Sequence, residues 1–429
     1  MSHPIAAHVN PAAPISETNH EMKLIWLGHF IPFPPRGGAH QRSYHLLRQA
    51  SRTHEVILVA FNRPPVDAET LESYRAGLQG FCSEIEFWEM PFTWKGPRWW
   101  AGLAANTVQS LPYSCEIYRA PALLSRWRAI LATHPDAIVH IDSSDLAVYA
   151  HEAAGRRVLL NHHNCESAMA VRRAALERNI AKKLAMSAQA RKQAALEQRL
   201  CAEVSVNAVV SVVDGESLRL ECPSAHVHVV ENGTDTEYFV PEPQSVEPNS
   251  LVFAGSMNWY PNISGLRYFR ERIWPRLKGE MSELKLFVAG FSPGIEMKEW
   301  ARSEPALTLV ANPDDIRPWI AKGAVFICPI IDGGGTRLKL LDAMSAGKAI
   351  VSTRIGAEGL GIEEGKQALV AGSDEEFVEL TLKALRSTSL RTSLARSARQ
   401  FVEERYSWNI VGRNLERAYG CNAHEDGVV

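Results

Sequence analysis

The sequence predicts an α/β protein with two doubly wound domains, each a parallel sheet covered by helices. Short apolar runs bounded by glycine or polar residues alternate with longer amphipathic stretches, which is typical of strand–helix–strand units. The short runs are apolar at nearly every position, as expected for strands buried on both faces of a parallel sheet. The alternation restarts after a proline-rich stretch at 241–248, which predicts a second domain of the same kind.

The first half opens with an apolar run that ends in glycine. A loop rich in proline and glycine follows and then an amphipathic stretch, the order expected of a strand, a connection and a helix. A long helical region is expected at 166–205. The strands expected in this half are 23–28, 55–61, 137–141, 157–160 and 208–212, with a helix at 39–52 between the first two.

The second half repeats the pattern. Its first strand also ends in glycine and leads into a helix with Ile263, Leu266, Phe269 and Ile273 at helical spacing. Ligands of such sheets bind at the carboxyl ends of the strands, and two facing sheets are expected to form an interdomain cleft. The strands expected here are 251–255, 284–290, 307–310, 324–328 and 349–352.

Domain limits follow from these patterns. We expect a disordered tail at 1–21, a first domain at 22–240, a linker at 241–250 and a second domain at 251–405. The last segment, 406–429, should form a helix that returns to the first domain and a short tail.

Composition excludes several classes of protein. The chain has 429 residues and a net charge of −2, so it carries no field suited to binding nucleic acid. Its seven cysteines include no C-x-x-C pair, which argues against a disulfide framework and a structural zinc site and fits a reducing compartment. No secretory signal and no apolar run of 18 residues is present, so we expect a cytoplasmic protein without a spanning helix.

The clearest chemical signal follows the strand at 324–328. There a glycine loop leads into a helix whose first turn holds two cations, although cations at that end oppose the helix dipole. An anion bound at this terminus explains the two cations. A diphosphate can accept two parallel hydrogen bonds from the Arg337 guanidinium, and the compact charge of the Lys339 ammonium attracts it. The carboxylate of Asp342 could accept both hydroxyls of a ribose. The segment that carries this signal comprises Asp332, Gly333, Gly334, Gly335, Thr336, Arg337, Lys339 and Asp342.

Two further loops have the same strand-to-helix position. In the first domain, Gly37 and Gly38 precede a helix, where glycine lets the backbone approach a ligand and the helix terminus attracts phosphate. In the second domain, Gly255 and Asn258 lie in a similar helix entry. The first loop is also compatible with an ordinary tight connection, and the second with a capped helix entry in which Asn262 lies near the N-cap.

A polar cluster follows the strand at 157–160. His163 in this cluster could face the ligand and hydrogen-bond a sugar hydroxyl or a phosphate, or it could simply pack. Metal binding is not expected, because His162 and His163 would point apart in an extended chain.

At these residues the sequence resembles the retaining glycosyltransferases of the GT-B fold, family 4. Residues 333–353 and 356–359 are similar to the donor-binding signature of that family. Three other motifs resemble its bacterial branch of envelope polysaccharide synthesis: Pro-rich-Gly at 32–38, His-Asn-x-Glu at 163–166 and Gly-x-Met-x-Trp-x-Pro-Asn at 255–262. The resemblance covers about residues 22–410.

The resemblance implies transfer of a sugar from a nucleotide-diphosphate sugar, with retention of configuration, to a saccharide or lipid-linked acceptor. His163, Arg337 and Lys339 would be catalytic, with the cations stabilising the leaving diphosphate, so neither a metal nor another cofactor is expected. The leaving phosphate oxygen would take the acceptor proton. The nucleobase would lie against Asn312 and Asp315.

The segment also departs from the family pattern. The Glu–seven residues–Glu motif has Gly334 in place of its first acid and Asp342 in place of its second. A non-catalytic nucleotide-binding or scaffold protein derived from the same fold is therefore the alternative function.

Two segments raise the hypothesis of peripheral contact with the inner face of a membrane. Residues 94–100 combine three tryptophans with two cations, which suits a membrane interface or a lipid-linked acceptor but also tryptophan packing. Residues 171–200 carry eight Arg or Lys and two Glu. They could form a basic face for anionic lipid or polyphosphate, or a solvated helix.

Overall fold

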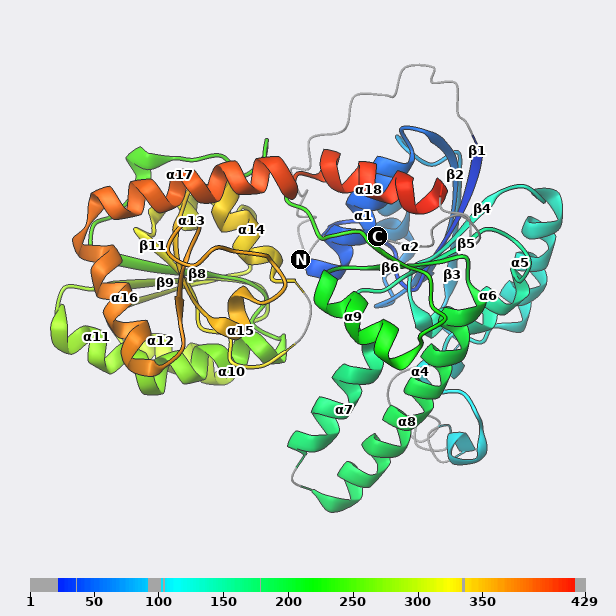
Figure 1. Ribbon diagram of the computed structural model, residues 1–429, viewed down its shortest axis with the longest axis horizontal. Coiled ribbons are helices and arrows are strands. Elements are labelled where there is room, and N and C mark those ends of the chain that lie inside the picture. The colour runs from blue at the N-terminus through cyan, green and yellow to red at the C-terminus, as the bar shows by residue number, and fades with distance from the viewer. Residues whose placement is uncertain are drawn as a thin grey trace. The chain divides into compact units, whose positions relative to one another are not determined.

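The computed structural model places the chain in two compact units, whose elements Figure 1 traces. Within the described part of the chain, unit 1 comprises Asn232–Val411, and unit 2 comprises the residues before and after that span. Residues 241–250, the expected linker, lie inside unit 1. The structure describes residues 22–35, 37–91, 102, 105–177, 179–333 and 336–420.

Unit 2 contains a seven-stranded, entirely parallel sheet with the order β3-β2-β1-β4-β5-β6-β7. The order reverses between β1 and β4, so the carboxyl ends of these two neighbours form the switch point of a doubly wound sheet. The strands are β1 (Met22–Gly28), β2 (His54–Asn62), β3 (Glu84–Glu89), β4 (Ile138–Ile141), β5 (Val158–Asn161), β6 (Val206–Val209) and β7 (Val227–Val229).

Helices lie on both faces of this sheet, which explains why Leu24, Ile25, Trp26 and Leu27, successive residues of β1, are all fully buried (Figure 1). The final helix, α18 (Trp408–Gly420), begins in unit 1 and ends in unit 2. The other helices of unit 2 are α1 (Gly38–Ala50), α2 (Ala68–Leu78), η1 (Asn106–Val108), α4 (Tyr113–Glu116), α5 (Pro121–Thr133), η2 (Ser144–Leu146), α6 (Ala147–Glu152), α7 (Glu166–Leu176), α8 (Ile180–Glu203) and α9 (Val212–Glu221).

Two expected elements of unit 2 differ in the structure. The helical region at 166–205 is divided into α7 and α8, because Asn179 caps α8 by accepting the Lys182 amide at 3.0 Å. The strand expected at 208–212 was predicted with the wrong carboxyl end, because β6 ends at Val209. Ser211 there caps α9 by accepting the Asp214 amide at 3.1 Å, which ends the extended backbone.

Unit 1 contains a six-stranded parallel sheet with the order β10-β9-β8-β11-β12-β13. Its switch point lies between β8 and β11, and the two sheets confirm the predicted doubly wound fold class. The strands are β8 (Ser250–Ala254), β9 (Lys285–Gly290), β10 (Leu307–Ala311), β11 (Val325–Cys328), β12 (Ala349–Thr353) and β13 (Leu369–Ala371). The helices are η3 (Pro243–Ser245), α10 (Tyr260–Tyr268), the π-helical turn η4 (Phe269–Ile273), α11 (Trp274–Glu280), α12 (Ile295–Ser303), α13 (Arg317–Lys322), α14 (Leu338–Ser345), α15 (Arg354–Ala357), α16 (Asp374–Arg386) and α17 (Thr388–Arg405).

The sequence analysis missed three strands, β3, β7 and β13, and each lies at the edge of its sheet. The residues of β3 alternate acidic with apolar and are only partly buried, so they lack the continuous apolar run that marks central strands. The other two strands are three residues long, too short for a periodic signal.

Candidate active site

The switch point of unit 1 gathers a glycine-lined group of cations. Gly255 directly follows β8, and Gly333 lies in the loop between β11 and α14. Around them the structure brings together Asn262, Arg337 and Lys339. We call these five residues the cation cluster.

Lys339 is partly buried and fixed on several sides. Its ammonium group donates a hydrogen bond to the Asn262 side chain and lies 4.5 Å from the centre of the Phe253 ring. A Cβ atom at Gly255 would approach Lys339 Nζ to 3.1 Å, so the glycine makes room for this arrangement. Burial, together with the positive charge of Arg337, lowers the pKa of Lys339 to about 8.

Arg337 is buried, and its side chain folds back onto the loop that precedes it. Its Nη2 donates to the Gly333 carbonyl at 3.0 Å. Gly333 has a φ of +113°, and an added Cβ would lie 2.9 Å from Pro261 Cγ, so glycine is required here. The helix α14 begins at Leu338, which corrects the expectation that its first turn holds both cations. Arg337 is therefore the N-cap residue and Lys339 lies within the first turn.

Asp342 lies one turn beyond Lys339 in α14 and has a partner of its own. Its Oδ1 accepts the Thr234 hydroxyl at 2.6 Å. Burial, with a smaller contribution from Asp235, raises the pKa of Asp342 to about 7. The carboxyl group therefore changes its charge close to neutral pH.

The remaining predicted donor residues of unit 1 lie in other hydrogen bonds. Asp332 accepts the Gly333 amide at 2.6 Å, and Asn258 is exposed and accepts the Ser256 hydroxyl at 2.8 Å. Thr336 is partly buried and directly precedes the N-cap residue Arg337. Gly334 and Gly335 lie outside the described residues.

Two predicted base-binding residues follow the edge strand β10. Asn312 adopts a positive φ of 52° and accepts the Ser292 amide at 2.8 Å. Asp315 accepts from Nε and Nη2 of Arg317, whose guanidinium lies 3.9 Å from the centre of the Tyr238 ring. Burial opposes ionisation of Asp315, but the Arg317 hydrogen bonds outweigh it and lower the pKa of the carboxyl.

The switch point of unit 2 is organised around a carboxylate. Asp142 follows β4 immediately, is fully buried, and donates its amide to the Leu27 carbonyl of β1 at 2.9 Å. Its Oδ2 accepts the Ser43 hydroxyl at 2.6 Å and its Oδ1 accepts the Asn161 amide at 2.7 Å. Arg42 in turn donates to Asn161 Oδ1 at 2.8 Å. These elements hold Asp142 in one orientation.

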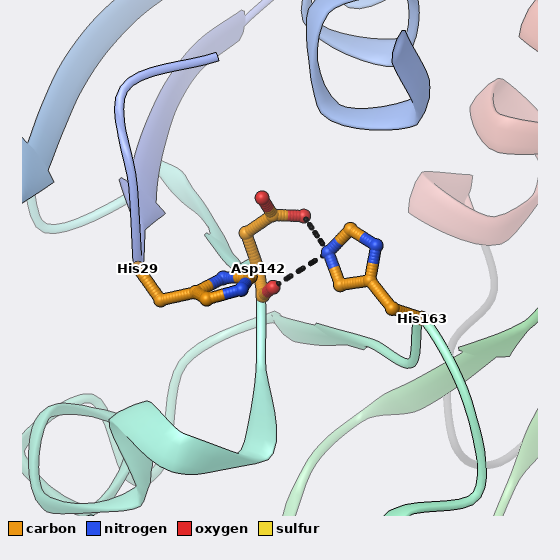
Figure 2. Close-up of side chains that lie close together, drawn as sticks. All are labelled: His29, Asp142 and His163. Atoms are coloured by element: carbon orange, nitrogen blue, oxygen red, sulfur yellow. Dashed lines mark hydrogen bonds and ion pairs between the residues drawn. The ribbon is translucent and has the colours of Figure 1, made fainter. Parts of the chain in front are cut away.

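His163 lies against this carboxylate, as Figure 2 shows. Its Nε2 is 3.0 Å from the Asp142 carbonyl oxygen and 3.3 Å from Asp142 Oδ1. Both neighbours are acceptors, so Nε2 carries a proton that it donates toward them. Burial alone would raise the pKa of Asp142, but His163, as a charge and as a donor, holds it well below its usual range.

Two more histidines surround this group. The ring of His29 lies 5.3 Å from that of His163, and His40 stacks on Phe30 at 4.1 Å. Burial first, and repulsion from His163 second, lower the pKa of His29 to about 3 and that of His40 to about 4. Both rings are therefore neutral at physiological pH.

The glycine loop of unit 2 begins the nearby helix α1. Gly37 is the N-cap residue with a φ of +100°, and Gly38 is the first helical residue. A Cβ at Gly37 would meet no described atom within 4 Å, so packing does not require glycine here. The positive φ does favour it.

Two groups among the described residues have the geometry to hold a cation: His29, Asp142 and His163 (Figure 2), and Cys165, Glu197 and Glu221. In the first group, both oxygens of Asp142 already accept hydrogen bonds from Ser43 and Asn161. A cation there would compete with these donors. The absence of a metal remains a prediction.

The sequence analysis missed Asp142, Asn262 and Thr234. The position of Asp142 directly after an apolar run was a usable signal, because polar residues at strand ends meet at one sheet edge. Asn262 stood in a quoted motif but was interpreted as a helix cap, whereas the structure begins α10 at Tyr260 and directs the Asn262 side chain to the Ser256 carbonyl and Lys339. Thr234 is 108 residues from Asp342, and no local pattern marks it.

Comparison with known proteins agrees with this geometry. The family model described as "Glycosyltransferase Family 4" matches residues 36–238, and the one described as "Glycosyl transferases group 1" matches residues 248–387. A curated relative, "Uncharacterized 44.6 kDa protein in cps region" from Klebsiella pneumoniae, is 27% identical over 164 residues. That match covers 37% of this chain and 42% of the relative, so the chain spans about two fifths of the relative's length.

Solved structures are similar over most of the chain. Sucrose-phosphate synthase from Thermosynechococcus elongatus has a TM-score of 0.69 at 12% identity, covering 93% of this chain and 98% of its own. Anabaena HepE in complex with UDP and glucose has a TM-score of 0.64 at 13% identity, covering 93% and 99%. WaaG, a glycosyltransferase involved in lipopolysaccharide biosynthesis, has 0.60 at 15% identity, covering 93% and 99%. At these identities the similarity concerns the fold, which is GT-B. With two complementary family matches on that fold, this chain belongs to the GT-B glycosyltransferases of family 4, the group 1 glycosyl transferases.

Proposed function

We propose that this glycosyltransferase moves a sugar from a nucleotide-diphosphate sugar, with retention of configuration, to a hydroxyl of a saccharide or lipid-linked acceptor. The observation that carries the proposal is the cation cluster at the unit 1 switch point. We assign the reaction to bacterial polysaccharide or glycoconjugate synthesis, supported by the similarity to WaaG, which is involved in lipopolysaccharide biosynthesis.

The donor diphosphate is the group that suits the cation cluster. Arg337 and Lys339 are held at a helix terminus beside glycines that leave the backbone open to a ligand. Negative charge develops on the diphosphate as the sugar leaves, and pre-positioned cations stabilise it without a metal. The similar HepE was solved with UDP and with UDP-glucose, which supports a nucleotide-sugar donor.

Asp342 is assigned to the ribose of the donor. An ionised carboxylate accepts hydrogen bonds from two adjacent hydroxyls, and with a pKa of about 7 the group ionises readily when such donors arrive. Thr234 holds one of its oxygens in place. Asn312 and Asp315 are assigned to the nucleobase by resemblance to the family.

His163 is assigned to a hydroxyl of the transferred sugar. Its Nε2–H is committed to Asp142, so Nδ1 is left to accept a hydrogen bond. Such a contact orients the sugar while the leaving phosphate oxygen takes the proton from the acceptor, and no enzymic base is required. The reaction therefore depends on positioning and on charge stabilisation.

A hydrolysis screen of UDP-, GDP- and ADP-sugars without acceptor tests the donor assignment. We expect turnover of at least one donor, and Arg337→Ala should lower it by about 100-fold or more, the usual effect of removing a transition-state donor. Arg267→Ala is the matched control, since Arg267 is an exposed arginine of the same unit paired with Glu296. If Arg337→Ala keeps the parent's rate, the diphosphate assignment is wrong.

The scaffold alternative rests on the departures at Gly334 and Asp342. A thermal-shift measurement with UDP and GDP, combined with the hydrolysis screen, separates the transferase from the scaffold. A ligand that binds the native state raises the melting temperature. A shift without turnover of any donor favours a nucleotide-binding scaffold. The absence of any shift contradicts the donor site itself.

A further inference from the structure

Helices α7 and α8 pack against each other as a pair that extends from unit 2 (Figure 1). The base of α8 is part of the core, since Leu196 and Leu200 are buried. Towards the other end, the helices lose contact with the rest of the unit. We call the described residues 171–177 and 179–185 the arm tip.

Apolar side chains of the arm tip face solvent. Ile180 is 77% exposed, Leu184 is 67% exposed and Val171 is 56% exposed. Ile180 and Leu184 are one helical turn apart and share a face of α8. Single exposed apolar residues are common, but the arm tip carries three of them within a short stretch of sequence.

A fourth exposed apolar residue belongs to the same arm. Val108, 91% exposed, lies on η1, and η1 is tied to α8 because Gln189 donates to the Asn106 side chain at 2.9 Å. Lys192 also donates to the backbone carbonyl of Asn106. Val108 is therefore a further exposed apolar side chain beside the middle of α8.

Positive charge is concentrated at the same place. Arg172, Arg173, Lys182 and Lys183 are all exposed in the structure. These four basic residues stand beside one acidic residue of the arm tip, Glu177, whereas the whole chain has a net charge of −2. Exposed aliphatic side chains surrounded by cations are complementary to a surface that is apolar beneath a layer of anionic groups.

We propose that the arm tip docks on the surface of an anionic lipid bilayer. The aliphatic side chains enter the boundary between headgroups and acyl chains, and the long basic side chains reach the lipid phosphates. A second copy of the chain fits less well, because two arm tips would bring like charges together. The inference does not rest on sugar transfer, although docking would bring the enzyme to lipid-linked acceptors.

Vesicle flotation of the full chain tests the proposal. We expect binding to phosphatidylcholine vesicles that contain about one third phosphatidylglycerol, little binding to pure phosphatidylcholine, and weakening by salt. Lys182→Glu with Lys183→Glu should weaken binding by about 25-fold or more, given about fivefold for each cation near the surface. Ile180→Ser with Leu184→Ser should weaken it by about tenfold or more.

The control is Ile295→Ser with Lys298→Glu on α12 of unit 1, where Ile295 has the same 77% exposure as Ile180 and Lys298 is exposed. It should bind vesicles like the parent, and all three variants should fold because the changed side chains face solvent. The proposal is overturned if the parent does not bind anionic vesicles, or if the arm variants and the control bind alike. It is also overturned if the parent binds only soluble polyphosphate, or self-associates in a way that Ile180→Ser with Leu184→Ser abolishes.

Discussion

The two switch points have the same topology but different chemistry. In unit 1, glycines after β8 and β11 leave space that Arg337 and Lys339 occupy, so the edge is lined by cations. In unit 2, the corresponding neighbours β1 and β4 are followed by His29 and Asp142, and His163 follows β5. Here a buried carboxylate orients a histidine.

The difference shows how one fold prepares two kinds of contact. A cation held near a helix terminus is suited to an anion of high charge, because the attraction needs no exact direction. A histidine with one nitrogen committed to a carboxylate offers a single directed acceptor, which suits a hydroxyl. We expect mutations in unit 2 to act first on structure and mutations in unit 1 to act first on ligand affinity.

The largest effect should come from Asp142→Ala. The variant leaves the side chains of Ser43 and Asn161 buried without their shared acceptor and removes the negative charge near buried Arg42. Breaking a buried charged network typically costs about 3–5 kcal/mol. Hydrogen exchange of peptides from β1 and β4 under mild denaturant measures this loss. Peptides from β8 and β11 are the internal control and should exchange as in the parent. Equal destabilisation of both units would contradict the separation of roles.

The same network shows what a sequence can and cannot reveal. The central strands were predictable because burial on both faces leaves a continuous apolar run. The cations of the donor segment were predictable because they oppose the dipole of their own helix. Asp142 makes contacts with residues 99 and 19 positions away, and such partners follow from the sheet order, which a single sequence does not display.

The exposure of the arm tip was equally hidden. Its basic residues were visible in the sequence, but apolar residues at helical spacing normally indicate a buried face. The structure shows that Ile180 and Leu184 have no core to cover. Length and periodicity identify a helix, and only the tertiary arrangement tells whether its apolar side has a partner.

Lys339→Ala should have the next largest effect, this time on affinity. Removing a charge-assisted contact should weaken UDP binding at pH 7 by about 10- to 100-fold. The pKa of about 8 adds a signature: parent affinity should fall as pH rises through 8, because only the protonated amine attracts the diphosphate. The variant should show no such fall. Calorimetry between pH 6.5 and 9.5 measures both the affinity for UDP and its pH dependence. Lys298→Ala is the control for an exposed lysine. If the parent and Lys339→Ala give parallel curves of affinity against pH, Lys339 does not contact the donor.

Asp342→Asn should give a smaller and opposite change in stability. The folded pKa of about 7 is raised above the unfolded value, so the parent loses stability as pH rises from about 4 through 7. The amide avoids this loss and still accepts the Thr234 hydroxyl, so the variant should be more stable by about 1–2 kcal/mol at pH 8. Near pH 4 the two proteins should unfold alike. A gain that persists at pH 4 would show that ionisation is not its cause.

The smallest effect, from Gly37→Ala, sharpens the comparison between the two glycine loops. Gly37 and Gly333 both have positive φ, but a Cβ at Gly333 collides with Pro261 whereas one at Gly37 meets no described atom. Gly37→Ala should therefore cost only the backbone strain, about 1 kcal/mol, while Gly333→Ala adds a steric clash. If the Gly37 backbone approaches the donor, the KM of the Gly37→Ala variant for the donor should rise by more than the loss of stability explains. If a folded Gly37→Ala protein keeps the parent's KM for the donor, then of these two glycine loops only the loop of unit 1 recognises the donor.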